Sequence, residues 1–193
     1  MINVSPAVQN SPWFSLPDEI KLHIIQFVPK QYLIPLEATC KNFCHLVFSQ
    51  ITKEDAVDFC AKAASLGELK LLQWARANGA PWDAQTCYNA AEGGHLKLLQ
   101  WARANGAPWD KLICDYAARG GQLEVLKWAR ANGARWDEGA CARAAQNGHL
   151  EVLKWARANG APWDEWTCAN ADAGGHLEVL QWARANGAPE PEY

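Results

Sequence analysis

Residues 82–108 read WDAQTCYNAAEGGHLKLLQWARANGAP, and the same pattern returns every 27 residues along most of the chain. Chains that repeat at such a period fold as solenoids, in which each unit packs on its neighbours. We expect five units, at 55–81, 82–108, 109–135, 136–162 and 163–187, and a tail at 188–193. The period is marked by tryptophans and cysteines at fixed places, namely Trp74, Trp101, Trp128, Trp155 and Trp182, and Cys60, Cys87, Cys114, Cys141 and Cys168.

Each unit contains the pattern of two helices. In residues 82–108, Asp83 is a suitable N-cap for a first helix, and Gly93-Gly94 would end it. A second helix is predicted from His95 to Asn105, ending at Gly106, a residue that readily adopts a left-handed conformation. No strand-like alternation is present, so the sequence predicts an all-α fold.

Composition excludes some classes of partner. The chain has 193 residues, is 49% hydrophobic and carries a net charge of −3 without a stripe of Lys and Arg. Such a charge pattern disfavours nucleic acid as a partner. Apolar runs fall far short of the roughly 20 residues that a bilayer span needs, and the N-terminus lacks a signal-like segment, so membrane insertion and secretion are disfavoured.

The cysteines point to a reducing compartment. Stacked helices lie roughly 8–10 Å apart, whereas a disulfide needs Cα atoms closer than about 7 Å, so neighbouring cysteines of the repeat are not expected to pair. We expect buried, reduced thiols in a cytoplasmic or nuclear protein. Cys40, Cys44 and His45 could suggest zinc, but no second pair follows at ligand spacing, which favours core packing.

The N-terminal part does not repeat. Residues 1–14 are polar and expected to be disordered. Residues 15–50 carry the pattern of three short helices: Pro17 suits a first turn, Pro29 ends the first helix, and Pro35 opens the third. Thr52 begins the next helix, and the short join predicts that this unit covers the open face of the first repeat as a cap.

Two family resemblances follow from these patterns. The segment Ala144-Ala145-Gln146-Asn147-Gly148-His149-Leu150-Glu151-Val152-Leu153 resembles the centre of the ankyrin repeat. That repeat has about 33 residues, and the difference falls where ankyrins carry a β-hairpin finger. The resemblance therefore implies an ankyrin-like helical solenoid that binds proteins through its first helices. The short, Trp-rich form is similar to arrays found in giant DNA viruses of amoebae and in some protists, and a viral protein would act in the cytoplasm or nucleus of its host.

Residues 15–50 resemble an F-box over their full length, from Ser15-Leu16-Pro17-Asp18-Glu19-Ile20 to Thr39-Cys40-Lys41 and Phe43. Many family members carry Trp where this chain has Phe43, and Pro35 is unusual for the family. F-boxes bind the Skp-family adaptor of cullin-RING ubiquitin ligases. The resemblance implies that six residues make that contact: Leu16, Pro17, Ile20, Ile24, Leu33 and Leu36.

Positions that differ between copies are candidates for binding a target protein, because the stack itself does not require them. Neutral drift of exposed residues is the alternative reading. Trp166 is the most pronounced case, since sister units carry Gln85, Leu112 and Gly139 at its place. The other candidates on the first helices are Tyr88, Asn89, Asp115, Tyr116, Arg119, Arg143 and Asn170.

Other residue patterns favour structural roles. His95, His149 and His176 recur at helix starts, and Gln122 replaces one of them, which favours hydrogen bonding to neighbouring loops over a metal or catalytic role. The recurring Glu and Lys pairs are typical of solvated ion pairs. We find no motif of an enzyme and expect no cofactor. At the end of the array, one side of Leu180 and Trp182 is expected to be exposed.

Two functions remain at this point. The chain is either a substrate receptor that joins a ubiquitin ligase to a target protein, or a plain interaction scaffold whose N-terminal helices only cap the stack. Catalysis would belong to the partners in the first case.

Overall fold

The computed structural model describes residues 53–190. The expected three-helix unit at 15–50, its six adaptor-binding residues, the N-terminal segment 1–14 and the end of the tail lie outside the described residues. The described part is helical and contains no strand, which confirms the predicted all-α class. Its helices are α4 (Lys53–Ser65), α5 (Leu69–Ala77), α6 (Ala84–Glu92), α7 (Leu96–Ala104), α8 (Leu112–Arg119), α9 (Leu123–Ala131), α10 (Glu138–Gln146), α11 (Leu150–Ala158), α12 (Glu165–Ala173) and α13 (Leu177–Ala185).

The chain divides into two compact units. In the described part of the first, Phe59 of α4 lies against Trp74 of α5, with ring centroids 6.4 Å apart. The guanidinium of Arg76 lies over the ring of Trp82, 4.1 Å from its centroid. Leu71 and Leu72 of α5 are fully buried.

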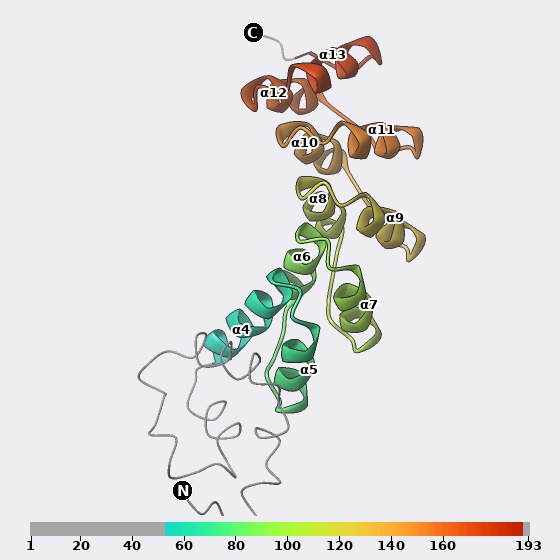
Figure 1. Ribbon diagram of the computed structural model, residues 1–193. Coiled ribbons are helices and arrows are strands. Elements are labelled where there is room, and N and C mark those ends of the chain that lie inside the picture. The colour runs from blue at the N-terminus through green and yellow to red at the C-terminus, as the bar shows by residue number, and fades with distance from the viewer. Residues whose placement is uncertain (1–52, 191–193) are drawn as a thin grey trace, which may run out of the picture. The chain divides into compact units, whose positions relative to one another are not determined.

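The second unit contains α6 to α13, arranged as successive helix pairs (Figure 1). The first helices of the pairs form a continuous row, in which α8 packs against α6 and α10, and α10 packs against α12. Small side chains make this close packing possible, because Cys114, Ala117 and Ala118 of α8 are fully buried between neighbours. The five repeat cysteines are buried and free, as the spacing predicts.

The second helices are held by a recurring pair of aromatic contacts. Arg130 at the end of α9 lies 4.0 Å over the ring of Trp136, and Trp136 in turn packs edge-on against Trp155 of α11 at 5.9 Å. The same Arg130 donates a hydrogen bond to the carbonyl of Ala134. These contacts recur in the neighbouring repeats, so the repeat tryptophans belong to the scaffold.

The last pair differs from the expectation. Leu180 is buried, with 4% of its surface exposed, and Trp182 is half-buried and lies 6.1 Å from Trp163. The expectation that one side of Leu180 would be exposed is therefore wrong, because this side chain is buried. On α13, Leu177 is exposed, at 64%.

Candidate protein-binding face of the first helices

An aspartate accepts a backbone hydrogen bond at the start of α6, α8, α10 and α12; it is the N-cap of α6, α10 and α12, whereas the N-cap of α8 is Lys111. The carboxylate of Asp137 accepts a hydrogen bond from the backbone N–H of Gly139 at 3.0 Å, and the other aspartates do the same two residues ahead. The residue whose N–H donates this bond differs in each of these four repeats. It is Gln85, Leu112, Gly139 or Trp166.

Apolar side chains are exposed on this face at two places. Leu112 is 38% exposed and Trp166 is 59% exposed. Tyr116 of α8 is half-buried and stacks on Tyr88 of α6, with centroids 4.8 Å apart and planes 4° apart. Tyr88 is only 7% exposed, and burial together with its hydrogen bond to Asp110 raises the pKa of its phenol. Tyr88 therefore orients Tyr116 and offers little surface to a partner.

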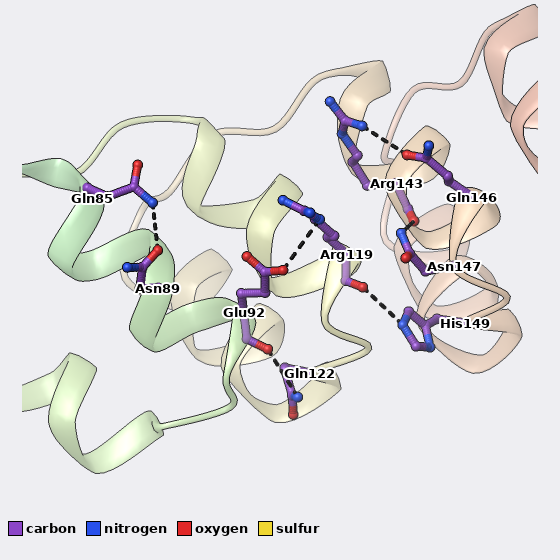
Figure 2. Close-up of polar contacts among 9 residues, drawn as sticks. All are labelled: Gln85, Asn89, Glu92, Arg119, Gln122, Arg143, Gln146, Asn147 and His149. Atoms are coloured by element: carbon purple, nitrogen blue, oxygen red, sulfur yellow. Dashed lines mark hydrogen bonds and ion pairs between the residues drawn. The ribbon is translucent and has the colours of Figure 1, made fainter. Parts of the chain in front are cut away.

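Two arginines stand at the C-terminal side of the face (Figure 2). Arg119, the last residue of α8, forms an ion pair with Glu92 of α6, with Nε and Oε1 3.4 Å apart. Arg143 of α10 donates a hydrogen bond to Gln146 Oε1 at 2.9 Å. Both arginines are exposed, so most of their N–H donors face solvent.

Asp115 of α8 is the unusual acid of the face. Its Oδ1 atom is buried without a hydrogen-bond partner among the described residues. Burial, and secondarily the carboxylate of Asp137, raises the pKa of Asp115 to about 7. Asp137 itself has a lowered pKa because Lys111 donates a hydrogen bond to it at 2.5 Å.

Two hollows lie on this face. The smaller, of about 200 Å³, is lined by Leu112, Asp115, Tyr116, Arg119 and Arg143. The larger, of about 430 Å³, is lined by Arg119, Arg143, Gln146, Asn147, Ala173 and Gly174. Because Arg119 and Arg143 line both hollows, the two are neighbours on this face, and we call them together the arginine groove.

The structure thus brings together half of the target-binding candidates, namely the five that line the smaller hollow. The others line neither hollow. Gln85 and Asn89 bond to each other at 2.6 Å on α6, and the Asn170 amide faces the carbonyl of Ala142 at 3.5 Å. Trp166 stands exposed on α12.

Sequence reasoning missed part of the larger hollow. Asn147 replaces a glycine that sister units carry at 93, 120 and 174, so the disagreement between copies could have found it. Gln146 and Ala173 also stand at a variable position, the one that Arg119 occupies in α8.

The histidines join consecutive repeats. The Nε2 atom of His149 lies 3.0 Å from the carbonyl oxygen of Arg119, and Gln122 donates to the carbonyl of Glu92 at 3.2 Å (Figure 2). His95 makes the equivalent contact with Ser65 at 3.0 Å. These side chains therefore satisfy carbonyls at the ends of the preceding first helices, a structural role.

The part of the chain that the structure describes holds no group of three or more His, Cys, Asp or Glu residues that could bind a metal ion. Within the same residues, no helix combines the length and the apolar character needed to cross a membrane.

Comparison with known families agrees with both sequence resemblances. The chain contains ankyrin repeats, for which the family model matches residues 87–130, and an F-box-like domain, for which the model matches residues 13–52. No curated protein matches the chain significantly. Both domains are typical of non-catalytic interaction modules, and together they support a role as a protein-interaction adaptor.

Proposed function

We propose that this protein recruits substrates to a ubiquitin ligase of the Skp, cullin and F-box type. The F-box-like domain would bind the Skp-family adaptor through Leu16, Pro17, Ile20, Ile24, Leu33 and Leu36. The first-helix face of the repeats would bind the target protein. The pairing of an F-box-like match with ankyrin repeats in one chain carries this proposal.

The physical role of such a receptor is proximity. Tethering a target beside the transferring enzyme replaces a bimolecular encounter by an intramolecular one, at an effective concentration set by the connection. The receptor needs no catalytic group of its own, because the ligase supplies the chemistry. Such a complex would act in the cytoplasm or the nucleus.

The test is a pull-down of a Skp-family adaptor and cullin by the full chain. We expect the wild-type protein to retain both, and the double variant Leu16→Ala/Pro17→Ala to retain at least about tenfold less adaptor, since two of the proposed contact residues are truncated. A matched control, Leu177→Ala/Pro189→Ala, changes the same residue types at exposed positions of the repeats and should bind the adaptor like the wild type.

Circular dichroism of each variant separates loss of binding from loss of folding. If the folded wild-type chain does not retain the adaptor, or the Leu16→Ala/Pro17→Ala variant retains it fully, the ligase proposal is wrong. The second candidate then stands: a non-enzymatic scaffold in which the N-terminal helices cap the repeat stack.

A further inference from the structure

The arginine groove has the donors of an anion-binding site. Arg119 and Arg143 line both of its hollows, and the larger hollow has no carboxylate in its lining. Each guanidinium has five N–H donors, and the contacts with Glu92 and Gln146 engage one nitrogen atom of each. The Gln146 amide accepts from Arg143 through its oxygen, which leaves its NH₂ group as a further donor toward an anion.

The charge around the groove favours a single negative group. Glu92 compensates Arg119, and Lys111 compensates Asp137. Asp115 faces Arg143, Lys111, Asp137 and Asp110, and since burial raises its pKa to about 7, it keeps much of its proton near neutral pH. The positive charge of Arg143 is then only partly compensated by Asp115.

The repeat scaffold does not require either arginine. At the position of Arg119, sister units carry Glu92, Gln146 and Ala173. At the position of Arg143, they carry Asn89, Tyr116 and Asn170. Two arginines therefore line the arginine groove at two positions where the fold accepts acids, amides and an aromatic ring, and stacking of the helices does not explain them.

The smaller hollow adds an apolar neighbour. Leu112 and Tyr116 line it beside the two arginines. Tyr116 is held in place by its stacking on Tyr88, so this wall is fixed before any partner binds. A segment that places an acidic side chain next to an apolar one would use both parts of the groove.

We propose that Arg119 and Arg143 together bind the side-chain carboxylate of a Glu or Asp residue in the target protein, while an adjacent apolar side chain of the same segment packs on Leu112 and Tyr116. This inference rests on the target-binding half of the proposed function and specifies the chemistry of the target. Paired guanidinium donors suit a planar carboxylate, because the two groups can form parallel hydrogen bonds.

The test is an NMR titration of the full chain with the tripeptide N-acetyl-Leu-Glu-Leu-amide, followed through the arginine Nε–Hε resonances. We expect saturable shifts of Arg119 and Arg143, with an affinity roughly tenfold higher than that of the Gln counterpart peptide, since two half-exposed ion pairs contribute. The variant Arg119→Gln/Arg143→Asn should lower the affinity for the Glu peptide about tenfold.

The substituted residues are those that sister repeats already carry at these positions, so the variant is expected to fold. The control Arg135→Gln/Lys154→Gln also removes two positive charges, at residues outside the groove, and should keep the affinity within about twofold. A third peptide, with phosphoserine in place of Glu, tests the alternative of a doubly charged group.

The proposal is overturned if the Glu and Gln peptides bind equally, if neither shifts these arginines up to about 20 mM, or if the control lowers affinity as much as the groove variant. Phosphopeptide binding more than about tenfold tighter than Glu binding would overturn the assignment to a carboxylate. Adaptor pull-down by the wild-type chain separates the two proposals. If this chain binds the Glu peptide but not the adaptor, only the ligase proposal is refuted. If it binds the adaptor but not the Glu peptide, only the groove proposal is refuted.

Discussion

Asp115 shows how one residue can take its properties from neighbouring repeats. Its carboxylate lies against the Cα of Gly139, where an added Cβ would stand only 2.5 Å from Oδ2. Sister repeats carry Tyr88, Ala142 and Ala169 at its position, none of which is charged. The acid is therefore accommodated because the next repeat has a glycine facing it.

The raised pKa of Asp115 makes its contribution to stability dependent on pH. The native state holds this proton up to about pH 7, whereas the unfolded chain releases it near the ordinary value of 3.8. The native state thus binds more protons between these values, so this group lowers the free energy of unfolding as pH rises from about 4 to 7. We expect Asp115→Asn to be nearly neutral at pH 4.5 and to stabilise by on the order of 1–2 kcal/mol at pH 8, after allowing for solvent screening.

Urea unfolding of the variant and the wild type at both pH values measures this difference. Asp172→Asn, at an exposed aspartate of α12, is the control and should show no such change with pH. An effect of Asp115→Asn that is equal at pH 4.5 and pH 8 would contradict the raised pKa.

Some glycines with positive φ lie against a side chain of the next repeat, and others have open space around them. Substitution by alanine should therefore reduce the free energy of unfolding by different amounts at the two kinds of position. Gly121 has φ +71°, and a Cβ there would lie 2.7 Å from the His149 ring, whereas Gly133 has φ +83° with open space around it. Gly133→Ala should destabilise by about 1–2 kcal/mol, the cost of a left-handed non-glycine residue. Gly121→Ala should cost about 1 kcal/mol more, because it also displaces the His149 hydrogen bond.

Chemical denaturation measures both costs. In a His149→Ala background, the excess cost of Gly121→Ala over Gly133→Ala should disappear, since the ring that it displaces is gone. An excess that persists without the ring would show that the two glycines differ for another reason.

At the scale of helices, the local signals in the sequence were sufficient to predict the elements. Asp83 caps α6 as its position indicated, and α7 ends at Ala104, next to the predicted boundary at Asn105. Such signals act within a few residues of the chain. Variation between copies was less informative. It shows that the stack does not require one particular residue at a position, but it does not show whether that position is buried. Tyr88 varies between copies and is nevertheless buried under Tyr116.

The arginine groove could not be predicted in full for a related reason. Arg119 and Arg143 belong to different helices, and their convergence depends on how α8 and α10 pack. Both were found as variable positions, but the sequence did not indicate that they line the same groove. The burial of Leu180 was missed in the same way, since burial is a tertiary property.

Equivalent leucines of two second helices test how much burial by neighbouring repeats contributes to stability. Leu150 of α11 is half-buried, whereas Leu177, at the same position of α13, is 64% exposed. We expect Leu150→Gln to destabilise by about 1–2 kcal/mol and Leu177→Gln by less than about 0.5 kcal/mol. Thermal or urea unfolding compares the two variants, and equal costs would mean that Leu177 is covered in solution.

At the scale of the whole molecule, the row of buried cysteines reports on the integrity of the array. Burial raises the pKa of Cys87 to about 11 and those of Cys114 and Cys141 to about 12, so these thiols are poor nucleophiles in the native state. Their alkylation therefore depends on opening of the repeat that holds them.

We expect iodoacetamide to label Cys168 at least about tenfold faster than Cys114 at neutral pH, as followed by peptide mass spectrometry. Among the described first helices, α8, which carries Cys114, packs between two neighbours, α6 and α10. The helix that carries Cys168, α12, packs against one such neighbour, α10. Labelling in denaturant should equalise the rates and serves as the control. Equal rates in the native state would indicate that the array opens as a single cooperative unit.

The bonds from His149 to Arg119 and from Gln122 to Glu92 each span 30 residues, because every repeat completes the helix end of the one before it. Duplication or loss of a whole repeat leaves each donor facing an equivalent acceptor, whereas insertion of one residue breaks the match. Gene recombination between near-identical units can therefore lengthen, shorten or shuffle the array without redesigning it. Arg119 and Arg143 belong to consecutive repeats, so duplication of these two repeats together would copy the pair.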